Sequence, residues 1–106
     1  MDTTYLLDLA GGSTAIVREI LDDFFRADAE DRRELAAALA AGNRTEVRTF
    51  VHRIKGAALS IGATDYAQVA LSVENGAESS ADLQEGVVAL LQAGQAFADW
   101  GTTYGG

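Results

Sequence analysis

The sequence predicts an all-α protein, an antiparallel up-and-down four-helix bundle with a short additional helix at the N-terminus. The 106 residues contain no Pro and many Ala, and this composition favours helices. Apolar residues recur at intervals of three and four, whereas no segment shows the period-two alternation of a half-buried strand. The length fits a single domain over residues 1–106, with its core over about residues 5–100.

The first half of the chain contains three predicted helical segments. A short helix over residues 5–9 ends at a Gly pair, and Ser13 is expected to cap a second helix that extends to about residue 27. The apolar residues of that second helix are Ile16, Val17, Ile20, Leu21, Phe24 and Phe25. A third segment over residues 28–41 either continues the second helix with a bend or follows it separately, and Gly42 is expected to end it.

The second half contains three more. Asn43 begins a helix that ends at Gly62, and Asn43 has capping-box spacing to Glu46. The inward-facing residues of this helix are Val47, Phe50, Val51, Ile54, Ala57, Ala58 and Ile61. We expect a further helix over residues 64–76, a loop over 79–81, a last helix over 82–100 and a frayed tail over 101–106. Four long amphipathic helices with short connections form an antiparallel bundle.

Composition and charge exclude several classes of function. The net charge of −8 argues against nucleic acid, whose phosphates require a positive surface. Without Cys there is no thiolate chemistry and no disulfide. No apolar run is long enough for a membrane span or a signal peptide, so we expect a cytoplasmic protein without direct membrane contact. Half of the eight basic residues fall in one short window, at Arg44, Arg48, Arg53 and Lys55.

His52 is the only His, and its place on the helix predicts that it faces solvent. At about 100° per residue, with Val47 at zero, His52 falls near 140°. The residues within roughly 60° of zero are Val47, Phe50, Val51, Ile54, Ala58 and Ile61. A histidine that served the core would lie on the apolar face instead. The residues that share its outward stripe are Arg48, Lys55, Gly56 and Leu59.

This stripe suits phosphoryl chemistry. A neutral imidazole is a good nucleophile near pH 7, and a phosphoryl group placed on it carries nearly two negative charges. Lys55, one turn away, is suited to neutralise that charge, and Arg48 is a second candidate. Gly56 costs the helix about 1 kcal/mol relative to Ala, but it leaves room for another molecule to approach. No nucleotide-binding loop or Mg²⁺ cage accompanies these residues, so the chain is expected to hold a phosphoryl group without binding ATP.

The stretch from His52 to Ala63, HRIKGAALSIGA, resembles the histidine-containing phosphotransfer (HPt) family. That family has the pattern His-x-hydrophobic-Lys-Gly, followed by small residues and a hydrophobic-Gly-Ala ending. His52, Lys55, Gly56, Gly62 and Ala63 all match it in type and spacing. Ala57 departs from it, because many members have Ser there. The resemblance covers about residues 5–100.

The resemblance implies roles for several residues. His52 would accept the phosphoryl group, Lys55 would hold its oxygens, and Gly56 would leave room for a docking receiver domain. Glu74 matches in position the Glu or Gln that hydrogen-bonds the second imidazole nitrogen in members of the chemotaxis-kinase type. Such a bond would fix the tautomer of the ring, as outer-shell groups do at metal sites.

The resemblance also implies partners and a setting. The partners would be response-regulator receiver domains and a sensor histidine kinase, in hybrid form or not. The chain itself would be a monomeric phosphocarrier without kinase activity, cofactor or bound metal, since the receiver domain would supply Mg²⁺. It would be cytoplasmic, either free-standing or as the cytoplasmic domain of a membrane-anchored hybrid sensor kinase.

The apolar arc of the second predicted helix spans about 180°, more than a bundle-facing stripe needs. Two explanations stand equally. Part of the arc is an exposed docking surface for a receiver domain, or the N-terminal residues Tyr5, Leu6 and Leu7 fold back and cover it. In the first case the expected partner contacts are Leu21, Phe25 and Leu59.

Other hypotheses remain at this stage. One is a helical protein-interaction module, without catalysis, whose surface His is incidental. A second is an enzyme with His52 as general base, but the chain has neither a paired nucleophile nor a cleft signature. Simple helical spacing favours a solvated face over a cation site for the acidic residues Asp22, Asp23, Asp28 and Asp31. Trp100 is expected to plug the core, and Tyr104 to lie in the frayed tail.

Overall fold

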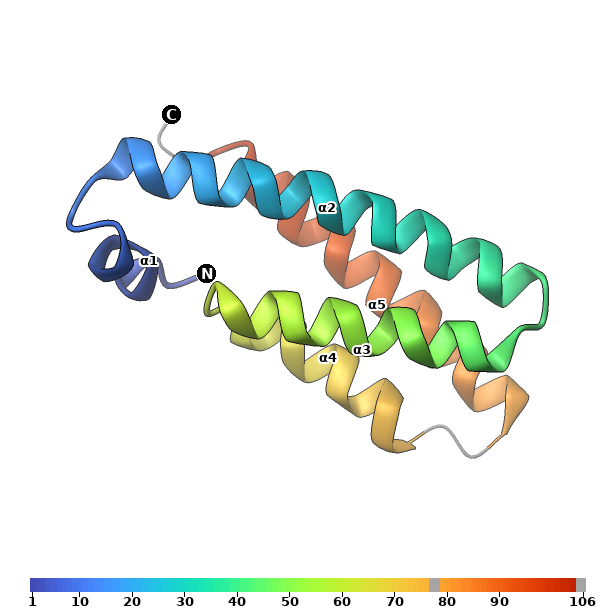
Figure 1. The fold of residues 1–106 in the computed structure, drawn as a ribbon. Helices are drawn as coiled ribbons and strands as arrows, with labels where there is room; N and C mark the ends of the chain where they lie inside the picture. Colours follow the sequence, from blue (N-terminus) through green and yellow to red (C-terminus); the bar gives the residue numbers. More distant parts are fainter. Residues whose placement is uncertain (77–78, 105–106) are drawn as a thin grey trace.

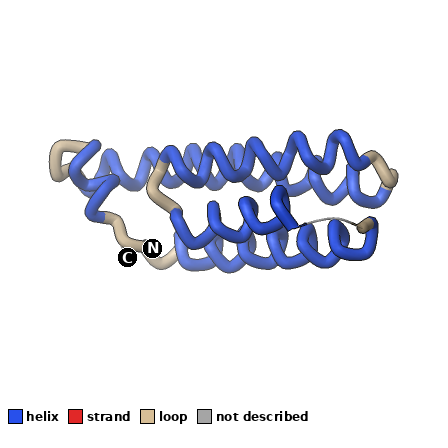
Figure 2. Tube along the Cα trace, turned by 90° about the horizontal axis from the view of Figure 1, so that it is seen from below, coloured by secondary structure: helices blue, strands red, loops and turns tan. Residues whose placement is uncertain are grey.

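The computed structural model describes residues 1–76 and 79–104, and it contains five helices and no strand in these ranges (Figure 1). The helices are α1 (Thr4–Leu9), α2 (Thr14–Ala40), α3 (Arg44–Ser60), α4 (Thr64–Gly76) and α5 (Ser80–Gly101). The predicted fold class, an all-α bundle with a short extra N-terminal helix, is confirmed (Figure 2). None of the described helices combines the length with the apolarity that crossing a membrane requires.

The four long helices alternate in direction. Figure 1 shows α2 and α4 running one way and α3 and α5 running back. Each long helix packs against the one before it, and α5 closes the bundle against α2. The N-terminal segment and the end of α5 therefore lie at the same end of the bundle, as Figure 2 also shows.

Helix α2 is a single helix of 27 residues, so the third predicted segment continues the second. Ser13 caps its start by accepting the Ile16 N–H. At its end Gly42 takes a left-handed conformation, with φ +69°, which Gly adopts without steric cost. Only one of the two hydrogen bonds of the predicted capping box at α3 is present. The Asn43 side chain accepts the Glu46 N–H, whereas the Asn43 N–H donates to the Ala38 carbonyl and not to the Glu46 side chain.

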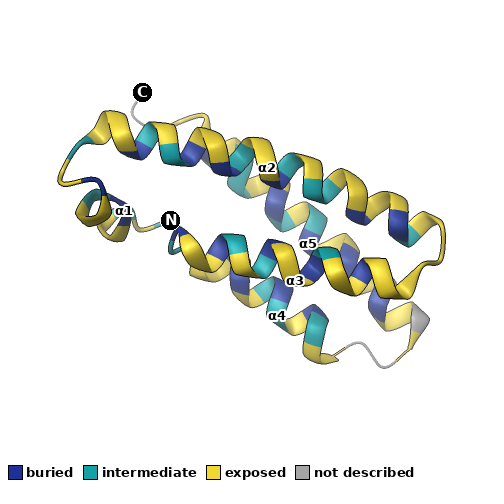
Figure 3. Cartoon of the chain, viewed as in Figure 1, coloured by how far each residue is buried: buried dark blue, intermediate teal, exposed yellow. Residues whose placement is uncertain are grey.

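The core lies between the four long helices (Figure 3). Its largest fully buried side chains are Leu6, Val17, Leu21, Leu35, Val47, Val51, Ile54, Val87 and Leu90. Helix α1 packs against α2, and Leu6 joins the same buried cluster as Val17 and Leu21. The N-terminal residues thus cover part of the apolar arc of α2. The prediction that Leu21 contacts a partner is wrong, because its side chain is 0% exposed.

Asp28 is buried, so its assignment to a solvated face is wrong. The Tyr66 hydroxyl donates to its Oδ1 over 2.9 Å, and Arg32 Nε lies 3.0 Å from its Oδ2. Burial raises the pKa of Asp28 above its usual range, against the lowering effects of Tyr66 and Arg32. The network joins α2 to α4 inside the bundle. Gly94 of α5 makes room for it, because a methyl group there would lie within 3 Å of both Arg32 and Tyr66.

Both ends of α5 differ from the prediction. The helix begins at Ser80, with Ser79 as its cap accepting the Asp82 N–H, so the expected loop over 79–81 is already helical from residue 80. At the other end Arg18 donates to the carbonyls of Gly101 and Tyr104, over 2.6 and 3.3 Å. Residues 101–104 are therefore held against α2 rather than frayed, and residues 105–106 lie outside the described residues.

Candidate functional site

His52 lies on the outer surface of α3, and its side chain is 69% exposed. Its ring nitrogen Nδ1 is 3.0 Å from Oε2 of Glu74 on α4. An ionised carboxylate only accepts hydrogen bonds, so Nδ1 must carry the proton and donate it. The lone pair of the ring is then on Nε2, the nitrogen that does not contact Glu74.

Glu74 also binds Lys55, whose Nζ lies 2.6 Å from its other oxygen, Oε1. One carboxylate therefore joins two α3 side chains that are three residues apart in sequence. The Lys55 hydrogen bond is the main cause that lowers the pKa of Glu74; the His52 hydrogen bond adds to it, and burial opposes both. Glu74 is thereby kept ionised, as the hydrogen bond to Nδ1 requires.

The local sequence explains how these three side chains meet. His52 and Lys55 are three residues apart, so they share the flank of α3 that faces α4. Helices α3 and α4 form an antiparallel hairpin through a short turn at residues 61–63 (Figure 1). This hairpin places Glu74 of α4 within hydrogen-bond distance of His52 of α3. Gly62 in this turn has φ +76°, and the Tyr5 ring packs so closely on it that an added Cβ would lie 2.9 Å from Tyr5 Cδ1.

The surface next to His52 is open. Apart from its chain neighbours and the backbone of its own helix, no atom lies within 4 Å of the point where a Cβ on Gly56 would stand. The hydroxyls of Thr49 and Ser60 donate to carbonyls of their own helix, over 3.0 and 2.6 Å, so neither is directed at a ligand. Leu59 is 54% exposed on the same side of α3. The open space at Gly56 and the exposed side chain of Leu59 allow another molecule to reach the imidazole.

The other predicted site residues lie in different places. Arg48 is exposed one turn before His52. Phe25, a predicted partner contact, is only half-buried but packs between α2 and α5, with its ring 5.0 Å from that of Phe97. The three predicted docking residues are Leu21, Phe25 and Leu59. Of these, only Leu59 is well exposed, and it lies beside His52. Arg53, although it follows His52, points towards α2, where it pairs with Asp31 over 3.3 Å.

Two features of the structure, one at the site and one in the core, were not predicted from the sequence. The Lys55–Glu74 ion pair was missed, although Lys55 is the only Lys and the chain has no basic residue after it. The burial of Asp28 was missed, although it follows Leu21 by seven residues and Phe24 by four, which is the spacing of a core position. Among the described residues, no group of three or more His, Asp or Glu side chains is arranged to hold a metal ion.

A family model of the Hpt domain matches residues 19–100 of the chain. The chain therefore belongs to the Hpt domain family. Comparison with curated proteins and with solved structures gave no match. Hpt domains carry phosphoryl groups on histidine in two-component phosphorelays, and they are phosphocarriers rather than kinases.

Proposed function

We propose that this chain accepts a phosphoryl group on Nε2 of His52, from the aspartyl phosphate of a receiver domain or from a kinase, and passes it to another receiver domain. The observation that carries the proposal is the 3.0 Å contact between Nδ1 and Glu74 on a ring that is 69% exposed. That contact fixes the tautomer in which Nε2 has the free lone pair. Because the ring is exposed, a phosphoryl group of another molecule can approach Nε2 in line.

The transfer step balances without a cofactor on this chain. The Nε2 lone pair attacks the phosphorus atom, the bond from phosphorus to the aspartyl oxygen breaks, and the receiver's carboxylate leaves with that electron pair. The phosphorylated ring keeps its Nδ1 proton and so becomes cationic. Glu74 stabilises that cation through the same hydrogen bond. We expect the receiver domain to supply Mg²⁺, and the reverse step returns the group to a second receiver.

Lys55 has two duties in this proposal. Its ammonium holds Glu74 in its ionised form, because the two groups lie 2.6 Å apart. Lys55 is also the cation nearest in sequence to His52 on the side of α3 that faces α4. It is therefore suited to offset the charge of the phosphoryl oxygens. Arg48, one turn before His52, is proposed as a second contributor.

The proposed partners are receiver domains and a sensor histidine kinase, in hybrid form or separate. A receiver domain would dock on the surface around Gly56 and Leu59, where the structure leaves space beside His52. Neither nucleic acid nor a membrane enters this proposal. We expect a cytoplasmic monomer.

The experiment is a transfer assay with a receiver domain charged by a low-molecular-weight phosphodonor. The chain is expected to take up an acid-labile, alkali-stable label, and His52→Gln is expected to abolish it. Thr49→Gln is the matched control, an exposed position of the same helix, and it should keep the label. A wild-type chain that takes no label would be the inert interaction module, and the proposal would be wrong.

A further inference from the structure

A groove runs along the bundle between α4 and α5. At the end near the termini it widens into a hollow of about 510 Å³, with a wall that includes Val69, Ala93, Ala96 and Trp100. At the other end a second hollow of about 370 Å³ includes Ser72, Gly76, Gly86 and Ala89 in its wall. Val69 lines both hollows, so the two are neighbouring parts of one groove.

The groove follows from small residues on α5. Ala89, Ala93 and Ala96 recur at intervals of four and three, which places them on one flank of the helix. Gly86 lets the helices approach at one point, because a Cβ there would lie 3.1 Å from a methyl group of Val73. Since the neighbouring side chains are too short to fill the space above this contact, the apolar wall stays open to solvent.

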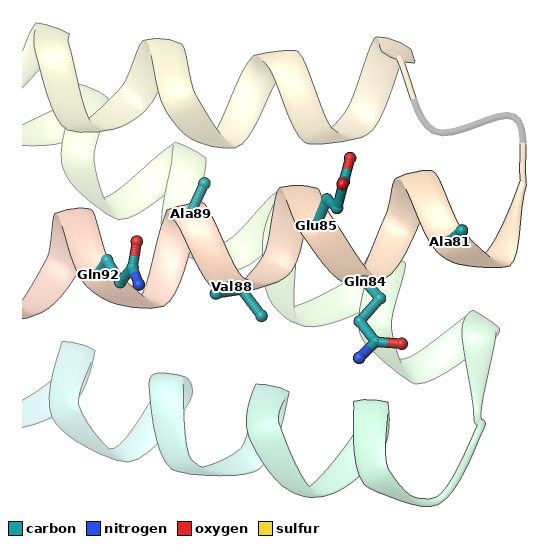
Figure 4. A pocket seen from close by; sticks show the side chains of 6 residues that line it. All are labelled: Ala81, Gln84, Glu85, Val88, Ala89 and Gln92. Carbon is teal, nitrogen blue, oxygen red and sulfur yellow. The ribbon is translucent and has the colours of Figure 1, made fainter.

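The rim of the groove is acidic. Asp65 stands beside the larger hollow, and Asp82 and Glu85 stand beside the smaller one. Figure 4 shows Glu85 and Ala89 pointing from α5 towards α4, whereas Gln84 and Val88 point the other way. The sequence has no Lys or Arg after Lys55, so neither helix of the groove contributes a basic side chain. Asp2 also lines the larger hollow, but it already accepts the Thr4 N–H.

We propose that this groove binds an amphipathic helix of a partner protein, with an apolar stripe that fills the groove and Lys or Arg residues that pair with Asp65, Asp82 and Glu85. The shape fits, because α4 has 13 residues and at 1.5 Å per residue offers a groove of about 20 Å, enough for three turns of a bound helix. The charge fits, because the rim offers carboxylates along both hollows and neither α4 nor α5 adds a basic side chain to it.

The groove is separate from the phosphotransfer site. Glu74 points from α4 to α3, whereas Val69, Ser72 and Gly76 lie on the opposite flank of α4 by helical spacing. A partner in the groove therefore leaves His52 accessible. Such a partner would hold the chain near its phosphodonor or phosphoacceptor and raise the local concentration of reacting groups.

The test uses Trp100, the only Trp of the chain, as a fluorescent reporter in the groove wall. The probe is a Leu/Lys amphipathic helical peptide of about 14 residues, which matches the length of α4. We expect saturable binding with a blue shift of Trp100 emission. A Leu/Glu version, and a scrambled Leu/Lys version without an apolar stripe, should not produce it. Equal binding of all three peptides, or no change in Trp100 emission, would overturn the proposal.

Two variants separate the groove from general attraction to an acidic protein. Ala96→Lys places a cation in the groove at an exposed position and should weaken binding about tenfold. Gln84→Lys is the control at an exposed position of α5 that points away from α4 in Figure 4, and it should change affinity less than about twofold. Equal weakening by both variants would show charge attraction alone. If His52 takes no label at all, the proposed function is wrong, but peptide binding in the groove is unaffected. If labelling is lost only when the peptide is bound, the two sites are not separate.

Discussion

Glu74 and Asp28 are two carboxylates of the bundle that each hold two partners, one of which is a cationic side chain. Glu74 binds Lys55 and the His52 ring, and Asp28 binds Arg32 and the Tyr66 hydroxyl. Their environments differ. Glu74 stands at the edge of α4 with a side chain that is 23% exposed, whereas Asp28 lies inside the bundle.

The difference in burial has opposite electrostatic results. At Asp28 desolvation is the largest effect and raises the pKa, despite two hydrogen-bonding partners. At Glu74 the Lys55 hydrogen bond is the largest effect and lowers the pKa. A buried carboxylate can fix the position of two helices, but no partner protein reaches it. A carboxylate at the surface can stay ionised and hold an imidazole beside solvent, as phosphotransfer requires.

The largest expected effect is on stability. Asp28→Ala leaves Arg32 without its carboxylate and the Tyr66 hydroxyl without its acceptor, both at buried or nearly buried positions. We expect the free energy of unfolding to fall by about 3 kcal/mol or more, measured by denaturant titration. Glu74→Ala, at the partly exposed site, should lower it by about 1 kcal/mol. Equal losses would contradict the division into a structural and a functional carboxylate.

The next effect is on transfer rate. Glu74→Gln keeps the size of the side chain, and its amide oxygen can still accept the Nδ1 proton, but it lacks the negative charge that stabilises the cationic ring. Transfer to His52 should slow by about tenfold to a hundredfold, with the free energy of unfolding little changed. Asp28→Asn is the matched control in the core and should leave the rate of the folded protein within about twofold. A Glu74→Gln variant with the wild-type rate would show that the negative charge of Glu74 has no part in the transfer step.

A smaller loss is expected at Lys55. Lys55→Ala removes the ammonium 2.6 Å from Glu74 and should slow transfer about tenfold while the fold stays intact, as monitored by circular dichroism. Lys55→Arg should restore part of the rate, because it keeps the charge. If the Ala variant transfers at the wild-type rate, Lys55 has no part in the reaction.

The smallest effects concern pH. The pKa of Glu74 is lowered from 4.5, so its contribution to stability is present above pH 4.5 and is lost as the pH falls through its lower folded value. The pKa of Asp28 is raised from 3.8, so its effect has the opposite sign: stability is favoured below pH 3.8 and lost as the pH rises through the higher folded value. NMR titration of the two carboxyl carbons should place Glu74 below 4.5 and Asp28 above 3.8. Shifts in the reverse directions would contradict the comparison.

The sequence predicted those parts of the molecule that depend on local spacing. Helical arithmetic put His52 outside the apolar seam of α3, and its side chain is exposed. The single bundle fold and the end of α2 at Gly42 followed from periodicity and from the conformational freedom of Gly. The likeness of the His52–Ala63 stretch to Hpt domains implied that Glu74 on the next helix hydrogen-bonds the imidazole, and the two side chains lie 3.0 Å apart.

The parts that were missed depend on contacts between helices. Leu21 and Leu59 are both apolar residues on helices, but their exposure differs. Leu21 is buried in the core of α2, against which α1 packs, whereas Leu59 on α3 is exposed. Spacing within one helix cannot show this difference. The charge of Asp28 predicts a position in solvent, but Tyr66 of α4 and Arg32 hold its carboxylate inside the bundle, and the contact with α4 is not visible in the spacing of α2. The Lys55–Glu74 pair required the register between α3 and α4, which the turn at residues 61–63 sets.

The central claim is that Glu74 holds Nδ1 and leaves Nε2 of His52 to carry the phosphoryl group. The most direct measurement is NMR of the ¹⁵N-labelled chain after transfer from a charged receiver domain, with the phosphorus–nitrogen coupling assigned to one ring nitrogen. The geometry predicts phosphorylation at Nε2, with the Nδ1 proton retained. A phosphoryl group on Nδ1, or one on any residue other than His52, would contradict it.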